Sequence, residues 1–387
     1  MVTTASPTTL DDLVEQLVSR RAIRHAVVAV ESADQTLRLT RAAGQARPDG
    51  TPMRPDTPFH YASVTKLYTA TVVMELWEQG RLGLEVPIRA YLPTEVTDGL
   101  HRLHGVDHSD AITVRHLLSH TSGLPDYFLD TPEGETSFTD LLLQGDVAYD
   151  LADVVARVRR LTPYFPPQEP GAARRRARYS DTNFQLLGAI VAAVTGTTFQ
   201  QAVEDQLLEP LGLDDTWFAG RPRDDHARVP AAIWSGDEVL VAPQAMASMA
   251  AEGGLIGTAA DALSFLRALI GGRLFAQDTT LGLMQERWTR FGLPRSRTAI
   301  MAPGWPIEYG LGIKRYRLPR LLNAGRRAPT LIGHTGASGS WLFWCPEHEL
   351  YLAGTVDQTT AAGLPYQRLP RAIRNLSTPS RAGGDRP

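Results

Sequence analysis

Ser63 and Lys66 are the residues of this chain whose types and spacing best fit a catalytic pair. Lys66 is one of only two lysines among 39 basic side chains, and the other 37 are arginines. Arginine stays protonated at any biological pH, whereas a lysine amine can lose its proton when burial or a neighbouring cation lowers its pKa. A neutral lysine can act as a general base. We therefore predict that Ser63 is a nucleophile and that Lys66 is its base.

An amphipathic helix is predicted directly after Ser63 and ends at Gly80. Residues three apart share a helix face, so the amine of Lys66 is within reach of the Ser63 hydroxyl, and the helix N-terminus favours an alkoxide. On its own, the pair could equally be a helix-capping serine and a solvated lysine. The helix is indicated by apolar residues at intervals of three and four: Leu67, Ala70, Met74 and Trp77.

Two further segments follow in order along the chain. Residues 179–183, Tyr-Ser-Asp-Thr-Asn, precede an apolar helix predicted over 184–191 that ends near Gly196, and residues 333–339, Gly-His-Thr-Gly-Ala-Ser-Gly, lie between strand-like runs. With these motifs the chain resembles the serine hydrolases related to penicillin-binding proteins and class C β-lactamases. That family, which includes esterases, D-aminopeptidases and transacylases, carries Ser-x-x-Lys, then Tyr-x-Asn, then Lys-Thr-Gly or His-Thr-Gly. Residues 115–125 and 253–261 also look like segments common in it.

The resemblance implies a role for each matching residue. Ser63 would form an acyl-enzyme with an ester or amide, Lys66 would be neutral or share its proton with Tyr179, and Tyr179 would relay a proton to the leaving group. The backbone N–H groups of Ser63 and Ala337 would form the oxyanion hole. The residues expected to bind substrate are Asp181, His334, Thr335 and Gly336.

Two of these residues depart from the family pattern. Asp181 stands where the penicillin-interacting members have asparagine, and a carboxylate offers no amide donor to a substrate carbonyl, which weakens the case for lactamase or peptidase activity. Asn183 is an amide that could take over this role. His334 replaces lysine, as in several peptidase and esterase relatives, and it binds a carboxylate only when protonated. The alternative for His334 is a solvent-facing strand histidine.

Strand-like runs at both ends of the chain, with helices between them, predict one sheet assembled from the two termini. The fold class expected is α/β of the α+β type, an antiparallel sheet flanked by helices with an inserted, mainly helical lobe, as in β-lactamases and transpeptidases. We predict a single catalytic domain over 8–378, with a sheet lobe from about 8–70 and 250–378, a helical lobe over 71–249 and a disordered tail over 379–387. The predicted strands are 25–31, 36–40, 330–334, 340–344 and 350–355, and the flanking helices are 10–18 and 366–375.

Length and charge agree with such an enzyme. The 387 residues, 43% of them hydrophobic, are ample for a large core, and the net charge of −3 gives no reason to expect nucleic acid binding. The chain has no apolar run long enough to span a membrane and no signal-peptide pattern, so we expect a cytoplasmic protein, or else a mature secreted form. The mechanism needs no metal or organic cofactor, and five dense histidines, His101 to His120, lack the companions of a zinc site. The oligomeric state stays open.

Smaller features carry further expectations. The sole cysteine, Cys345, lies in an apolar run and is predicted to be a buried, inert thiol. Thr258 and Asp261 form a capping-box pattern that opens a helix over 262–270. The arginine run 174–178, which ends beside Tyr179, could bind a substrate carboxylate or phosphate. Tryptophans that could line an acyl pocket are Trp234, Trp305 and Trp341.

Three functions remain open at this stage. The favoured one is a serine hydrolase of esters or small amides, possibly a transacylase that passes its acyl group to an acceptor other than water. The second is a D-amino-acid peptidase, DD-carboxypeptidase or β-lactamase. The third is a non-catalytic acyl-binding or scaffold protein, against which the intact Ser63, Lys66 and Tyr179 argue.

Overall fold

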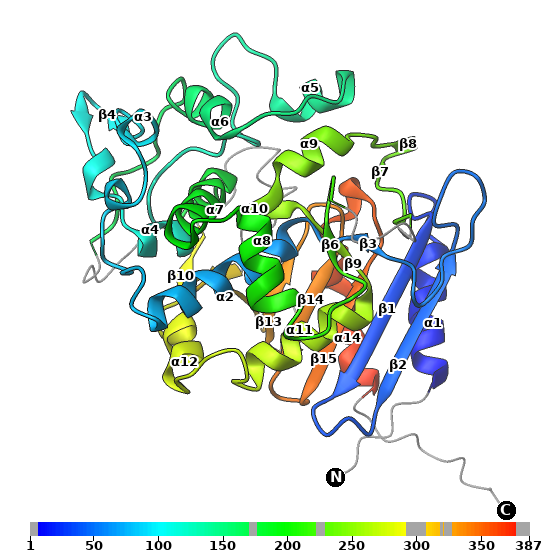
Figure 1. The fold of residues 1–387 in the computed structure, drawn as a ribbon. Coiled ribbons are helices and arrows are strands. Elements are labelled where there is room, and N and C mark those ends of the chain that lie inside the picture. Colours follow the sequence, from blue (N-terminus) through cyan, green and yellow to red (C-terminus); the bar gives the residue numbers. More distant parts are fainter. Residues whose placement is uncertain are drawn as a thin grey trace, which may run out of the picture.

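An antiparallel sheet forms the centre of the computed structural model, which describes residues 7–169, 176–221, 229–291, 307–317, 320 and 327–376. Helices lie on both sides of this sheet (Figure 1). Its eight strands run in the order β10 (Thr289–Arg290), β11 (Ile307–Tyr309), β12 (Lys314–Tyr316), β13 (Leu331–Thr335), β14 (Trp341–Cys345), β15 (Leu350–Thr355), β1 (His25–Ser32) and β2 (Arg38–Gly44).

The first and the last strands of the chain are neighbours in the sheet. Val28 of β1 lies opposite Gly354 of β15 on one side and opposite Arg41 of β2 on the other. The prediction of one sheet built from both termini is therefore correct, and β15 has the predicted bounds.

Alternate residues of β1 belong to different layers of the core. Val27 and Ala29 pack in the cluster that includes α11 (Ala259–Ile270), whereas Val28 and Val30 pack in the cluster with α1 (Pro7–Val18) and α14 (Leu364–Leu376). Successive side chains of a strand point to opposite faces, so a strand covered on both faces is apolar at nearly every position.

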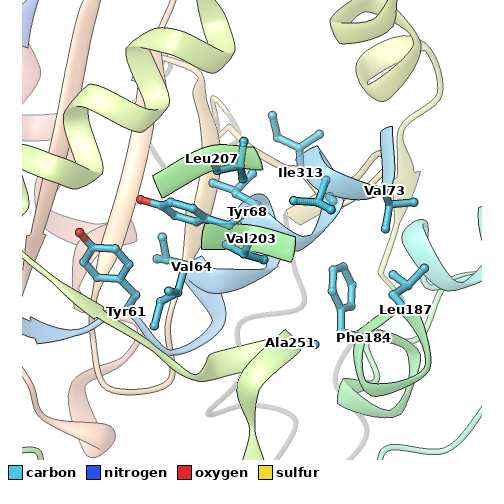
Figure 2. Packing of buried hydrophobic residues seen from close by; sticks show 14 of the residues in the cluster. Tyr61, Val64, Tyr68, Val73, Phe184, Leu187, Val203, Leu207, Ala251 and Ile313 are labelled. Carbon is cyan, nitrogen blue, oxygen red and sulfur yellow. The ribbon is translucent and has the colours of Figure 1, made fainter. Parts of the chain in front are cut away.

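The helix that follows Ser63 is buried on nearly all sides. In α2 (Thr65–Glu78), 11 of 14 residues are buried, so the prediction of an amphipathic helix is wrong. Figure 2 shows why: side chains from α7 (Asp181–Thr195), α8 (Phe199–Val203), η4 (Glu204–Leu208) and α10 (Ala250–Gly253) surround α2 together with Ile313. Helix α7 ends as predicted at Gly196, whose φ of 76° places it in the left-handed region that suits glycine.

The remaining elements form the periphery of the helical region and a second small sheet. The small sheet pairs β3 (Phe59–His60) and β6 (Trp217–Phe218) with β9 (Leu255–Gly257). Two hairpins consist of β4 (Arg102–Leu103) with β5 (Val106–Asp107) and β7 (Trp234–Ser235) with β8 (Glu238–Val239). The other helices are α3 (Thr94–Thr97), α4 (Val114–Leu118), α5 (Phe138–Gln144), α6 (Leu151–Val158), α8 (Phe199–Val203), α9 (Pro243–Ser248) and α12 (Thr279–Glu286), with short 3-10 turns such as η1 (Ala62–Val64) and a π turn, η4 (Glu204–Leu208).

Two smaller expectations have different outcomes. Cys345 is fully buried and burial raises the pKa of its thiol to about 12, which confirms an inert cysteine. The Thr258 side chain caps α11 by accepting the N–H of Asp261, but the Asp261 carboxylate accepts a hydrogen bond from Thr216 instead of closing a capping box. That half of the prediction is wrong.

No single helix in the described ranges combines the length and apolar character that a membrane span requires. One bent pair, α7 with residues 199–208, passes on length and composition with a bend of 79°. The tail over 379–387 lies outside the described residues, and the division into two lobes stays a prediction.

We predict that Gly312→Ala destabilises the fold more than Gly272→Ala does. Both glycines have φ near 70°, so alanine meets the same backbone strain of about 1 kcal/mol at each. A Cβ at Gly312 would also lie 2.1 Å from the Cβ of Ala70 on α2, whereas a Cβ at Gly272 meets nothing. Denaturant unfolding should show a loss of about 3 kcal/mol for Gly312→Ala. Equal losses for the two variants would contradict this packing.

Candidate active site

Ser63 lies in the strained turn η1, between β3 and the start of α2. Ala62, directly before it, has a φ of 46°, a left-handed conformation that is costly for a residue with a Cβ. The N–H of Tyr61 donates to the Leu255 carbonyl at 2.9 Å, which fixes the turn to β9. Val64 is the cap residue of α2, and the α2 terminus has no side-chain cap bond. The alternative that Ser63 is a capping serine is therefore wrong.

The hydroxyl of Ser63 receives two hydrogen bonds. Lys66 Nζ donates to Ser63 Oγ at 3.1 Å, and the Tyr179 phenol donates to the same oxygen at 2.9 Å. Burial, followed by the negative charge of Asp181, raises the pKa of Tyr179 well above its usual value, so the phenol is protonated at neutral pH. The structure thus brings together the three residues that the sequence placed in catalytic roles.

Lys66 is completely buried, and its ammonium is surrounded by acceptors. Besides Ser63, Nζ donates to the backbone carbonyl of Glu252 at 2.8 Å and lies 2.6 Å from Asp181 Oδ1. The rings of Tyr179 and Phe184 lie with their centroids 5.2 and 5.4 Å from Nζ. A solvated lysine, the other possibility that the sequence left open, is therefore wrong.

Asp181 is an ion-pair partner of Lys66 in this structure. Its side chain is 14% exposed and lies at the first turn of α7, two residues after Tyr179. The carboxylate compensates the buried positive charge of Lys66, which an asparagine amide would not do. Aspartate at this position is therefore chemically coupled to the lysine as well as being a candidate contact for substrate.

Lys314 is a site residue that the sequence analysis missed. It lies on β12, is 8% exposed, and its Nζ lies 4.9 Å from the centroid of the Tyr179 ring. Burial and, next, the charge of Lys66 lower its pKa to about 7. Both lysines of the chain thus lie beside Tyr179. The sequence did contain a signal for this residue, because Lys314 is the second of the two lysines in a chain that otherwise uses arginine. Lys314 was missed because it lies in no recognised motif.

His334 is a buried, neutral histidine. Its Nδ1 lies 2.8 Å from the Thr335 carbonyl, and its Nε2 lies 3.0 Å from the Tyr309 hydroxyl. With a carbonyl acceptor at Nδ1, the proton belongs on Nδ1, and Nε2 accepts from the phenol. Burial and the charge of Lys314 lower the pKa of His334 well below its usual value. The solvent-facing alternative is wrong, and a charged donor to a carboxylate is not what this environment favours.

The turn after β13 packs tightly against the turn that carries Ser63. A Cβ at Gly336 would lie 2.6 Å from the Tyr61 carbonyl oxygen and 2.8 Å from the Cβ of Ala62, so only glycine fits this approach. Among the described residues, the Ala337 N–H makes no hydrogen bond to a backbone carbonyl. The Thr335 hydroxyl lies 2.7 Å from the Tyr366 hydroxyl of α14.

Several other candidates are engaged elsewhere. Asn183 is fully buried, accepts from Ser122 at 2.7 Å and donates to His120 at 3.0 Å, so its proposed replacement of the family asparagine is wrong. Arg178 pairs with Asp130 at 3.2 Å, away from Ser63. Arg174, Arg175 and Trp305 lie outside the described residues.

The two remaining tryptophans differ in position. Trp341 is buried in the core cluster with α1 and α14 and does not line an acyl pocket. Trp234 is half-buried, with the guanidinium of Arg24 5.1 Å from its ring centroid. No group of three or more His, Cys, Asp or Glu side chains that could hold a metal ion occurs among the residues that the structure describes.

Comparison with known proteins gives consistent matches. A family model described as Beta-lactamase matches residues 10–372. Esterase EstB of Burkholderia gladioli is 30% identical over 327 residues, 78% of this chain and 78% of that protein. Penicillin-binding protein 4 of Amycolatopsis lactamdurans is 32% identical over 43% of this chain and only 38% of its own length. The crystal structure of a D-stereospecific amidohydrolase from Streptomyces sp. superposes with a TM-score of 0.72 at 25% identity, covering 97% of this chain and 100% of that one.

We predict that Lys314 titrates near neutral pH. A protein labelled with ¹³C-lysine should give only two lysine side-chain signals, because the chain has two lysines. The Lys314 signal, assigned by its loss in Lys314→Met, should move with a midpoint at about 7. A midpoint near the ordinary lysine value of about 10.4 would contradict the buried, lysine-facing position.

Proposed function

Because the chain belongs to the beta-lactamase family, we propose that Ser63 is the nucleophile of an acyl-enzyme mechanism on an ester or a small amide. The observation that carries the proposal is the convergence of Lys66 and Tyr179 on one hydroxyl, at 3.1 and 2.9 Å. The esterase and amidohydrolase relatives confirm the predicted serine hydrolase class, and the sheet with its flanking helices confirms the predicted fold class.

The proton of Ser63 needs an acceptor, and the resting geometry indicates which one. Lys66 and Tyr179 both donate to Ser63 Oγ, so neither is a base in this state. Asp181, 2.6 Å from Nζ, can take a proton from Lys66, after which the neutral amine accepts the proton of Ser63. Tyr179 then gives its phenol proton to the leaving group and is reprotonated by Lys66. Water or another acceptor releases the acyl group by the reverse transfers.

The oxyanion that forms when Ser63 attacks would be held by backbone donors. The proposed donors are the N–H groups of Ser63 and Ala337. Support comes from the close packing of Gly336 against the turn at Ala62 and from the Ala337 N–H, which bonds to no backbone carbonyl among the described residues. Loss of one such donor costs about 3 kcal/mol of transition-state stabilisation.

Esters are the substrates that this site favours. Asp181 presents a carboxylate where a substrate amide carbonyl would seek a donor, and that carboxylate is occupied by Lys66. The amidohydrolase relative supports D-amino-acid amides as the second candidate. A scaffold role is the weakest candidate, because burying Lys66 without a chemical use would only cost stability.

We expect turnover of short-chain chromogenic esters that is lost in Ser63→Ala. The panel should include nitrocefin and a D-alanyl p-nitroanilide, which test lactam and D-amide chemistry. Ester turnover alone supports the esterase proposal. Ester turnover that survives in Ser63→Ala would refute the assignment of the nucleophile, and no turnover with stoichiometric labelling of Ser63 would favour an acyl-binding protein.

Asp181→Asn tests whether the carboxylate selects against amides. The substitution supplies an amide donor of the same size, so the ratio of D-amide to ester turnover should rise by about tenfold, the effect of one added hydrogen bond. Ester turnover should fall, because the proton acceptor for Lys66 is lost. Both rates are measured as kcat/KM on the same preparation. An unchanged ratio of D-amide to ester kcat/KM would show that Asp181 does not set this selectivity.

A further inference from the structure

Glu252 is a buried carboxyl group next to the proposed base, and the mechanism above does not use its side chain. It lies on α10 and is only 3% exposed. Its backbone carbonyl accepts the hydrogen bond from Lys66 at 2.8 Å. The residue that orients the base therefore also carries an acid whose charge the base would sense.

The side chain of Glu252 is only half satisfied. Oε1 accepts from the Tyr127 hydroxyl at 2.5 Å and from Gln185 Nε2 at 2.8 Å, whereas Oε2 is buried without a partner among the described residues. A buried oxygen without a hydrogen bond is costly for a carboxylate and much less so for a protonated acid. The Tyr127 hydroxyl also lies 2.7 Å from that of Tyr149, so two tyrosine hydroxyl groups follow one another from Glu252.

We propose that Glu252 is a positioning residue that, by holding or releasing a proton beside the Lys66–Asp181 pair, sets the pH at which Lys66 can accept the proton of Ser63. This inference rests on the proposed function of Ser63 and Lys66. When Glu252 is protonated, only Asp181 compensates the Lys66 ammonium. When Glu252 is ionised, a second negative charge holds the proton on Lys66, and the amine is a poorer base.

The charged groups around Glu252 all affect the protonation equilibrium of its carboxyl group. Burial and the charge of Asp181 on α7 raise its pKa, Lys66 on α2 and the hydrogen bonds from Tyr127 and Gln185 lower it, and the outcome is a pKa of about 7. Attraction between two groups acts on both, so the influence of Lys66 on Glu252 implies an equal influence of Glu252 on Lys66. Burial and, next, the charge of Asp181 raise the pKa of Asp126, a further buried carboxyl, well above its usual value.

The test compares pH profiles of ester kcat/KM for the wild type, Glu252→Gln and Glu75→Gln. Glutamine keeps the size of Glu252 and cannot ionise, so the acid limb of the profile should move to lower pH by about one unit. Glu75 is the matched control: burial raises its pKa to about 8, and it lies on the same helix as Lys66, nine residues further on. Its variant should keep the wild-type profile. A lower rate in Glu252→Gln with an unshifted profile would overturn the proposal.

Two further measurements check the role of Glu252 independently. Tyr127→Phe removes a hydrogen bond that lowers the pKa of Glu252, so it should shift the profile in the same direction and by less. Infrared difference spectra of Glu252→Gln against the wild type at pH 6 should show the loss of a protonated carboxylic acid, and this readout does not require turnover. Its absence would overturn the proposal even if the esterase function holds. If the infrared signal is present but turnover does not depend on Ser63, the proposed function has failed, whereas the protonation of Glu252 is still supported.

Discussion

The burial of the Lys66 ammonium is the constraint on which the rest of the site depends. A charge removed from water costs several kcal/mol unless it is paired and hydrogen-bonded. Lys66 meets this requirement with acceptors from three elements far apart in the sequence: Ser63 on its own turn, Asp181 at the start of α7 and the Glu252 carbonyl on α10. These elements pack around α2, which is buried on nearly all sides (Figure 2). The hydrophobic packing thus supplies the free energy that holds the charge in place, and the charge determines which polar groups must face it.

A second buried lysine, Lys314, adds charge repulsion to this site. Lys314 and Lys66 lie on the ring of Tyr179 at 4.9 and 5.2 Å, and each disfavours the charge of the other. Asp181 partly relieves the repulsion. Lysine is used here because its amine can lose a proton, whereas arginine would keep both charges at any pH. Both lysines of the chain therefore lie in this buried site, where the proposed mechanism moves a proton.

The sequence was sufficient to predict features encoded in short motifs and apolar runs. It was not sufficient where the packing of distant segments determines the environment of a side chain. Ser63, Lys66 and Tyr179 belong to short motifs, and the strands at both termini follow from runs of apolar residues. The pattern after Ser63 was interpreted as amphipathic, since periodicity cannot reveal that a polar-looking position such as Thr69 faces another helix, where it donates to the Ala251 carbonyl. His334 was expected in solvent or charged, yet neighbouring aromatic and basic groups keep it buried and neutral. Glu252 could not be found because its importance comes from contacts with residues more than 60 positions away.

The site divides into a rigid half and a tunable half. The rigid half consists of the turns at Ala62 and Gly336, where a strained backbone and an approach that excludes any Cβ leave no room for variation. These turns would stabilise an oxyanion from any acyl substrate. The tunable half is the group of buried charges around Lys66, where a single exchange of carboxylate for amide changes both the basicity of the lysine and the donors offered to substrate. Relatives of this fold could therefore differ in ester or amide preference without moving the sheet, and in this chain the proposed mechanism gives Asp181 a part in both the proton transfer and the choice of substrate.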